Sequence, residues 1–143
     1  MTDITCTVSI DIKAPASKVW RALVEPEQIK KYLFGTDTKC DWRVGSPITF
    51  SGVWEGKPYE DKGTILAIEP HKLLKYNYWS GFSGQKDIPE NYQVITYEIN
   101  EANGKTTFTL TQENSPSEEA RDHSANNWNL VLNSLKEMVE GSN

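Results

Sequence analysis

Apolar and polar residues alternate at the start of the chain and predict a β-strand over residues 4–12. The positions between the apolar residues carry Thr, Ser or Asp. A period of two is typical of a strand with one face on the core and the other in water. The apolar set is Ile4, Cys6, Val8, Ile10 and Ile12.

Two short helices are predicted directly after this strand. Pro15 suits the first position of a helix, and apolar residues follow it at helical spacing. Pro26 begins a second helix that carries Ile29 and Tyr32. The apolar residues of the first helix are Val19, Trp20, Leu23 and Val24.

Residues 38–113 have the pattern of successive strands separated by turns. We expect a strand through Ile48, Phe50 and Trp54 that ends at residues 56–58, and further strands over 59–68 and 73–79. Two more strands, through residues 95–100 and 107–112, follow, and each strand from residue 73 onward places alternate residues inward. The inward residues expected from residue 73 onward are Leu74, Tyr76, Tyr78, Ile95, Tyr97, Ile99, Phe108, Leu110 and Gln112.

The C-terminal segment predicts one long helix of about 25 residues, ended by Gly141. Residues 115–118 read Ser-Pro-Ser-Glu, and we interpret them as a capping box in which Ser115 accepts from the Glu118 backbone. The second half of the helix carries a full apolar stripe. Its members are Trp128, Val131, Leu132, Leu135, Met138 and Val139.

The first half of that helix continues the stripe with small and polar residues, among them Arg121 and Ser124. Two interpretations remain open. This half projects into solvent, which the charged residues favour, or it roofs a cavity in which small side chains leave room.

Composition limits the class of protein. The 143 residues carry a net charge of −5, which argues against nucleic acid as a partner because such binding needs clustered Lys and Arg. The start of the chain lacks the pattern of a secretory signal, and no apolar run has the length of a membrane span. We therefore expect a cytoplasmic protein without membrane insertion, and we expect Cys6 and Cys40 to be reduced thiols.

The sequence offers little for catalysis or for a metal. Its only histidines, His71 and His123, belong to no zinc motif, so we expect neither a metal nor a cofactor. Arg121, Asp122 and His123 come nearest to a catalytic cluster. Neighbouring helical side chains diverge, so we interpret this cluster as a solvated helix face and assign no catalytic residue.

Four segments together resemble one known family. They are "APASKVWRAL" (14–23), "DWRVG" (41–45, resembling the family's second-strand motif), "GTILAIEPHKLL" (63–74), and Trp128 with the leucines that follow it. In this order they are similar to the START-like fold of the SRPBCC superfamily, in the Aha1 C-terminal-like branch (activator of Hsp90 ATPase homologues). The resemblance implies an α+β, Bet v 1-like helix-grip fold in one domain over residues 1–143. Its curved antiparallel sheet has about six or seven strands around the long helix.

Members of this superfamily bind lipids, hormones or polyketides, some are enzymes, and one is a co-chaperone. For this chain the resemblance and the inward aromatic residues predict binding of a small apolar or amphipathic molecule between sheet and helix, with a stress-related role. Two alternatives stay open: interaction with an Hsp90-type chaperone, or a cyclase or hydrolase that uses Tyr97, Arg121 or His123. We expect a monomer or weak homodimer. The residues expected to line the cavity are Phe34, Phe50, Trp54, Tyr76, Tyr78, Tyr97, Phe108, Gln112, Arg121, Ser124 and Trp128.

Overall fold

The computed structural model describes residues 4–33, 35–80 and 85–141, and it describes Trp54 only through its backbone. The helices and strands follow the order predicted from the sequence. In chain order they are β1 (Cys6–Ile12), α1 (Ala16–Val24), α2 (Pro26–Tyr32), β2 (Asp37–Cys40), β3 (Pro47–Trp54), β4 (Lys57–Glu69), β5 (Leu73–Ser80), the 3-10 turn η2 (Pro89–Asn91), β6 (Gln93–Ala102), β7 (Lys105–Glu113) and α3 (Glu118–Gly141).

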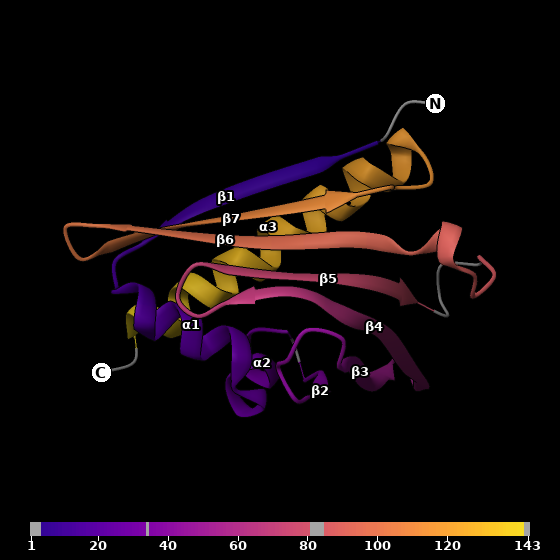
Figure 1. Cartoon of the computed structure of the whole chain (residues 1–143), viewed down its shortest axis with the longest axis horizontal. Helices are drawn as coiled ribbons and strands as arrows, with labels where there is room; N and C mark the ends of the chain where they lie inside the picture. Colours follow the sequence, from indigo (N-terminus) through magenta and orange to yellow (C-terminus); the bar gives the residue numbers. More distant parts are fainter. Residues whose placement is uncertain (1–3, 34, 81–84, 142–143) are drawn as a thin grey trace.

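The strands form one antiparallel seven-stranded sheet in the order β1-β7-β6-β5-β4-β3-β2. In Figure 1, α3 passes behind β1, β7 and β6, so the helix lies along one face of the sheet. The two short helices follow β1 and close one end of that face. The predicted α+β helix-grip fold is therefore confirmed.

Period-two alternation sets which residues enter the core. The residues predicted to point inward on β6 and β7 are all buried, and Leu74 and Tyr76 on β5 are 1% and 2% exposed. Tyr78 is half-buried. This buried side of the sheet, which we call the inner face, packs against α3.

The long helix is held to the sheet mainly by its second half. Leu132, Leu135 and Val139 are its buried residues, while Arg121 and Ser124 in the first half are half-buried. Polar contacts add to the packing: the Lys136 ammonium donates to the Asp11 carbonyl at 2.8 Å. The unevenness predicted from the apolar stripe is thus present in the structure.

The predicted capping box of α3 is wrong, and the cap lies two residues later. The Ser117 hydroxyl accepts the backbone N–H of Ala120 at 3.0 Å, and the helix begins at Glu118. The Ser115 hydroxyl is buried without a hydrogen-bond partner among the described residues. Instead, the Ser115 backbone N–H donates to the Ile4 carbonyl at 3.0 Å, which fixes that residue beside the N-terminal segment.

Ser117→Ala is expected to lower the free energy of unfolding by about 1 kcal/mol because it removes this cap. Ser115→Ala should cost less, since the hydroxyl that it removes has no partner to lose. Urea unfolding of both variants checks the assignment. A larger loss of unfolding free energy in the Ser115 variant would show that Ser115 caps the helix, as the sequence predicted.

Two strand boundaries also differ from the prediction. The β3–β4 turn is formed by Glu55 and Gly56, both at positive φ, and β4 then begins at Lys57 and includes Pro58. Proline is disfavoured inside strands, which is why the sequence suggested a later start. Residues 41–45 form the connection between β2 and β3 rather than a strand, and Gly45 there donates to the Ile65 carbonyl at 2.8 Å.

Candidate functional site

An apolar hollow lies on the inner face, between the two short helices and strands β3, β5 and β6. Its volume is about 10 Å³, close to the space that one water molecule needs. A pocket for an organic ligand usually has at least roughly 300 Å³, so side chains fill this region in the structure. The hollow is lined by Leu23, Ile29, Tyr32, Leu33, Trp42, Ile48, Phe50, Leu74, Tyr76 and Tyr97.

Three tyrosines bring hydroxyl groups to this otherwise apolar lining. The Tyr76 and Tyr97 hydroxyls share a hydrogen bond of 2.7 Å, and their rings meet edge to face. Burial raises the pKa of Tyr97 to about 12. Burial, together with the neighbouring Tyr97, also holds the pKa of Tyr32 well above its usual value. All three phenols are therefore protonated at neutral pH, and because one of the Tyr76 and Tyr97 hydroxyls donates to the other, only one of these two can donate elsewhere.

A polar bridge joins α3 to the sheet beside the hollow. The Trp128 indole N–H donates to the Gln112 side-chain oxygen at 2.7 Å, and the Gln112 amide in turn donates to the side-chain oxygen of Gln93. The Trp128 ring also meets Tyr97 edge to face. Gln112 is 5% exposed, so this bridge satisfies a buried amide and orients the indole ring.

A second group of polar side chains lies where β2, β3 and β4 run together. The Tyr78 hydroxyl donates to the Asp61 carboxylate. The pKa of Tyr78 lies well above its usual value, first because of burial and then because of the Asp61 charge. The Tyr59 hydroxyl bonds to Thr36 at 2.7 Å, and its ring crosses over Gly52, where a Cβ would come within 2.8 Å of that hydroxyl. We call Thr38, Asp61 and Tyr78 the polar end of the inner face.

The structure brings together only part of the predicted cavity lining. Phe50, Tyr76 and Tyr97 line the hollow, and Tyr78 contacts Phe50 with ring centroids 6.0 Å apart. The predicted residues Phe108, Gln112 and Trp128 form the next layer, toward α3. The predicted residues Arg121 and Ser124 are half-buried on α3 and do not line this hollow. Phe34 and the side chain of Trp54 lie outside the described residues.

Sequence reasoning missed Tyr32, Trp42, Thr38 and Asp61. The sequence contains a signal for Asp61. It shares one side of β4 with Gly63 and Ile65, and the apolar Ile65 marks that side as the one that points inward. Trp42 sits at a φ of 57° in the connection after β2, and nothing in the local pattern indicates that its side chain reaches the hollow.

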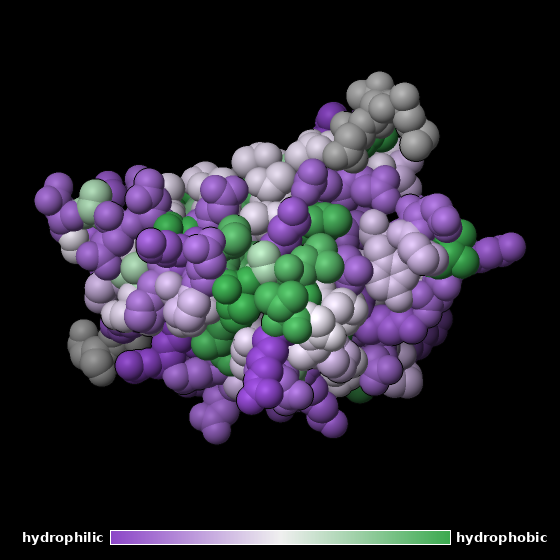
Figure 2. Space-filling view, in the orientation of Figure 1, coloured by the Kyte–Doolittle hydropathy of each residue, from purple (hydrophilic) through white to green (hydrophobic). Residues whose placement is uncertain are grey.

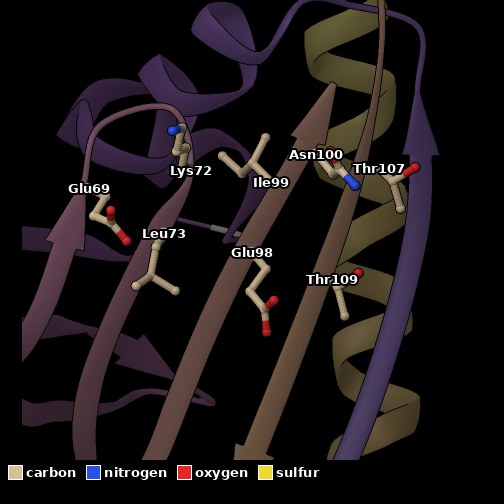
Figure 3. A pocket seen from close by; sticks show the side chains of 8 residues that line it. All are labelled: Glu69, Lys72, Leu73, Glu98, Ile99, Asn100, Thr107 and Thr109. Carbon is tan, nitrogen blue, oxygen red and sulfur yellow. The ribbon is translucent and has the colours of Figure 1, made fainter. Parts of the chain in front are cut away.

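A larger hollow of about 480 Å³ lies on the opposite, outer face of the sheet. Figure 3 shows its side chains in front of the strands, with α3 behind them. Several of them, including Glu98 and Asn100, are polar and exposed, so we do not assign the binding site here. Figure 2 shows apolar side chains gathered near the middle of this face, and Leu66 on β4 is 41% exposed.

Of the residues considered for catalysis, Tyr97 lines the hollow, whereas Arg121 and His123 do not. The Arg121 guanidinium pairs with Asp122 at 3.2 Å, and His123 is exposed. Within residues 4–33, 35–80 and 85–141, no three metal-ligand side chains come together. In the same ranges, no helix has the length and apolar character needed to cross a bilayer. Both cysteines are free thiols, and burial raises the pKa of Cys6.

A curved antiparallel sheet closed by a long C-terminal helix, with tyrosines in its interior, defines a helix-grip protein of the START-like class. The chain belongs to the family described as "Activator of Hsp90 ATPase homolog 1-like protein", whose sequence profile matches residues 13–140. The resemblance stated from the sequence is confirmed.

Solved structures place the chain among similar proteins. The solution structure of ChR145 from Cytophaga hutchinsonii is 43% identical over 96% of this chain and 94% of that one, with a TM-score of 0.84. The crystal structure of MLL2253 from Mesorhizobium loti is 24% identical, covers 98% and 99%, and has a TM-score of 0.79. The solution structure of the Aha1 dimer from Colwellia psychrerythraea is 20% identical over 96% of each chain, with a TM-score of 0.74. No protein with a curated description matches this chain in sequence.

Proposed function

We propose that the protein binds a small apolar or amphipathic molecule on the inner face, in an enlarged form of the hollow. The observation that carries the proposal is the convergence of the Tyr32, Tyr76 and Tyr97 side chains on an apolar hollow. A core that served packing alone would gain nothing from phenols over phenylalanines, because each buried hydroxyl must find a partner. Apolar walls with a few polar groups are the usual composition of a small-molecule site.

Binding requires the hollow to open, and α2 is the element best suited to move. It has seven residues, of which only Ile29 and Tyr32 are buried, and both line the hollow. Displacing α2 therefore exposes little apolar surface compared with displacing a strand. The ligand would replace the contacts that these two side chains lose.

Leu33→Trp tests this location, because Leu33 lies at the half-buried rim of the hollow. We expect the indole to occupy the space that a ligand needs and to weaken binding of the neutral probe 2-ethylnaphthalene by about tenfold or more. Probe fluorescence titration gives the affinity, and urea unfolding should show a stability close to that of the parent.

Leu130→Trp is the matched control, since Leu130 on α3 is 61% exposed and lies away from the hollow. It should leave the affinity unchanged. Equal affinities for the parent and both variants would place binding elsewhere, and no binding to the parent would reject the proposed function.

The family match favours one second candidate, a contact with an Hsp90-type chaperone. The apolar side chains that gather on the outer face offer a surface for such a contact. Titrating purified Hsp90 into the labelled protein and following the amide signals of β4 checks this. Unchanged signals at micromolar concentration would reject it.

The geometry supports binding better than catalysis. A general acid or base works best with a pKa near the working pH, and the pKa of Tyr97 is about 12. His123 is exposed on α3 and Arg121 is paired with Asp122, so neither completes an acid–base pair at the hollow.

A further inference from the structure

The polar end of the inner face contains a buried row of unlike side chains. Thr38 on β2 pairs with Phe50 on β3, and Phe50 pairs with Asp61 on β4. Directly paired residues of neighbouring strands point to the same face of a sheet. The three are 4%, 8% and 9% exposed, so a hydroxyl, a ring and a carboxylate lie side by side inside the protein.

Two oxygens of this row have no hydrogen-bond partner among the described residues. Tyr78 donates to one oxygen of the Asp61 carboxylate, and the other oxygen, Oδ1, is buried and unpartnered. The Thr38 hydroxyl is also buried and unpartnered. Buried polar groups in proteins are almost always satisfied, so two such oxygens on one face indicate a donor that the described residues do not supply and that a bound molecule would provide.

The Asp61 carboxylate also lacks a cationic partner among the residues that the structure describes, since no Lys, Arg or His there forms a salt bridge with it. The neighbouring Lys62 pairs with Asp87 instead. Buried carboxylates are ordinarily paired with a cation, because an isolated buried charge is strongly unfavourable.

Phe50 connects this row to the hollow. Its ring lines the hollow and lies 5.9 Å from Tyr76 and 6.0 Å from Tyr78, measured between ring centroids. Aromatic faces attract ammonium groups, and Tyr and Phe both act in this way. A molecule with its apolar body in the hollow would therefore reach Asp61 past an aromatic wall.

We propose that Asp61 Oδ1, assisted by the Thr38 hydroxyl, binds the ammonium group of an amphipathic amine whose apolar body occupies the opened hollow. This inference rests on the proposed function and adds the chemical class of the ligand. The amine supplies both the missing hydrogen-bond donor and the missing positive charge.

Three probes that share a naphthalene ring test the proposal: the amine 2-(2-naphthyl)ethylamine, the alcohol 2-(2-naphthyl)ethanol and the carboxylate naphthalen-2-ylacetate. Affinities for the parent protein come from fluorescence titration at neutral pH. We expect the amine to bind about tenfold or more tighter than the alcohol, and the carboxylate to bind weakest. In Asp61→Asn the preference for the amine over the alcohol should fall to about twofold or less, with the affinity for the alcohol retained.

Glu60→Gln is the matched control. Glu60 precedes Asp61 on β4 and is exposed, and the substitution removes the same negative charge as Asp61→Asn. It should keep the preference for the amine, which excludes a general attraction of cations to a protein of net charge −5. If Asp61→Asn does not fold, the relative affinities of the parent protein for the three probes still test whether an amine is preferred.

The outcomes separate the two proposals. Equal affinities of the parent for amine and alcohol, or the same preference in Asp61→Asn as in the parent, would overturn the amine site and leave the proposed function standing. No binding of any probe would overturn both.

Discussion

Phe108→Ala is expected to lower the free energy of unfolding by about 4 kcal/mol, the largest loss that we predict for a single side chain. Phe108 is 1% exposed on β7, and its ring centroid lies 5.3 Å from that of Tyr97. Its neighbours on either side, Ile10 on β1 and Ile99 on β6, are held by strand pairing and cannot close the space. Urea unfolding followed by tryptophan fluorescence measures the loss.

The control is Thr109→Ala, on the same strand and the opposite face. The Thr109 hydroxyl shares an exposed hydrogen bond with Ser9, so its loss should cost less than about 1 kcal/mol. A comparable loss for both variants would mean that Phe108 does not stand in the core between sheet and helix.

Gly63→Ala should destabilise the protein by about 3 kcal/mol, through a clash rather than a cavity. A Cβ at Gly63 would lie 1.7 Å from the Asn77 carbonyl oxygen, and backbone cannot turn away as a side chain can. Relief requires β4 and β5 to separate where Thr64 donates to the Asn77 side chain at 2.7 Å. The expected result is a lower unfolding midpoint and lost protection of amide protons on both strands.

Gly141→Ala provides the comparison for this glycine. Nothing lies within 4 Å of a Cβ at Gly141, the last residue of α3. Alanine favours the helix, so this variant should be neutral or slightly more stable. Equal stability of the Gly63 variant and the parent would show that the close approach of β4 and β5 is not as described.

The fold was predictable because its signals are periodic and repeated. The alternation that begins at Ile4, the prolines at the starts of both short helices and the stripe from Trp128 onward each specify an element without knowledge of its neighbours. Errors arose where two local interpretations competed. Ser115 and Ser117 both suit a helix cap, and the backbone contact of Ser115 with Ile4, 111 positions earlier in the chain, decides between them.

The site was predictable only in part, because it depends on contacts between distant segments. Phe50, Tyr76 and Tyr97 lie on strands with clear alternation, so the sequence indicates that they point inward. Tyr32 and Trp42 come from a helix end and a connection, whose placement over the sheet no local period determines. The polar end was missed because a carboxylate is ordinarily exposed, so the alternation that places Asp61 on the inward side of β4 was outweighed until Tyr78 is seen to donate to it.

The central claim is that the apolar space on the inner face opens to hold a ligand. The most direct measurement is a set of intermolecular nuclear Overhauser effects between 2-ethylnaphthalene and the methyl groups of the labelled protein. We expect contacts from the ring protons to Ile29, Ile48 and Leu74, all of which line the hollow. Contacts confined to exposed methyl groups such as those of Leu66 and Val44, at a saturating probe concentration, would contradict it.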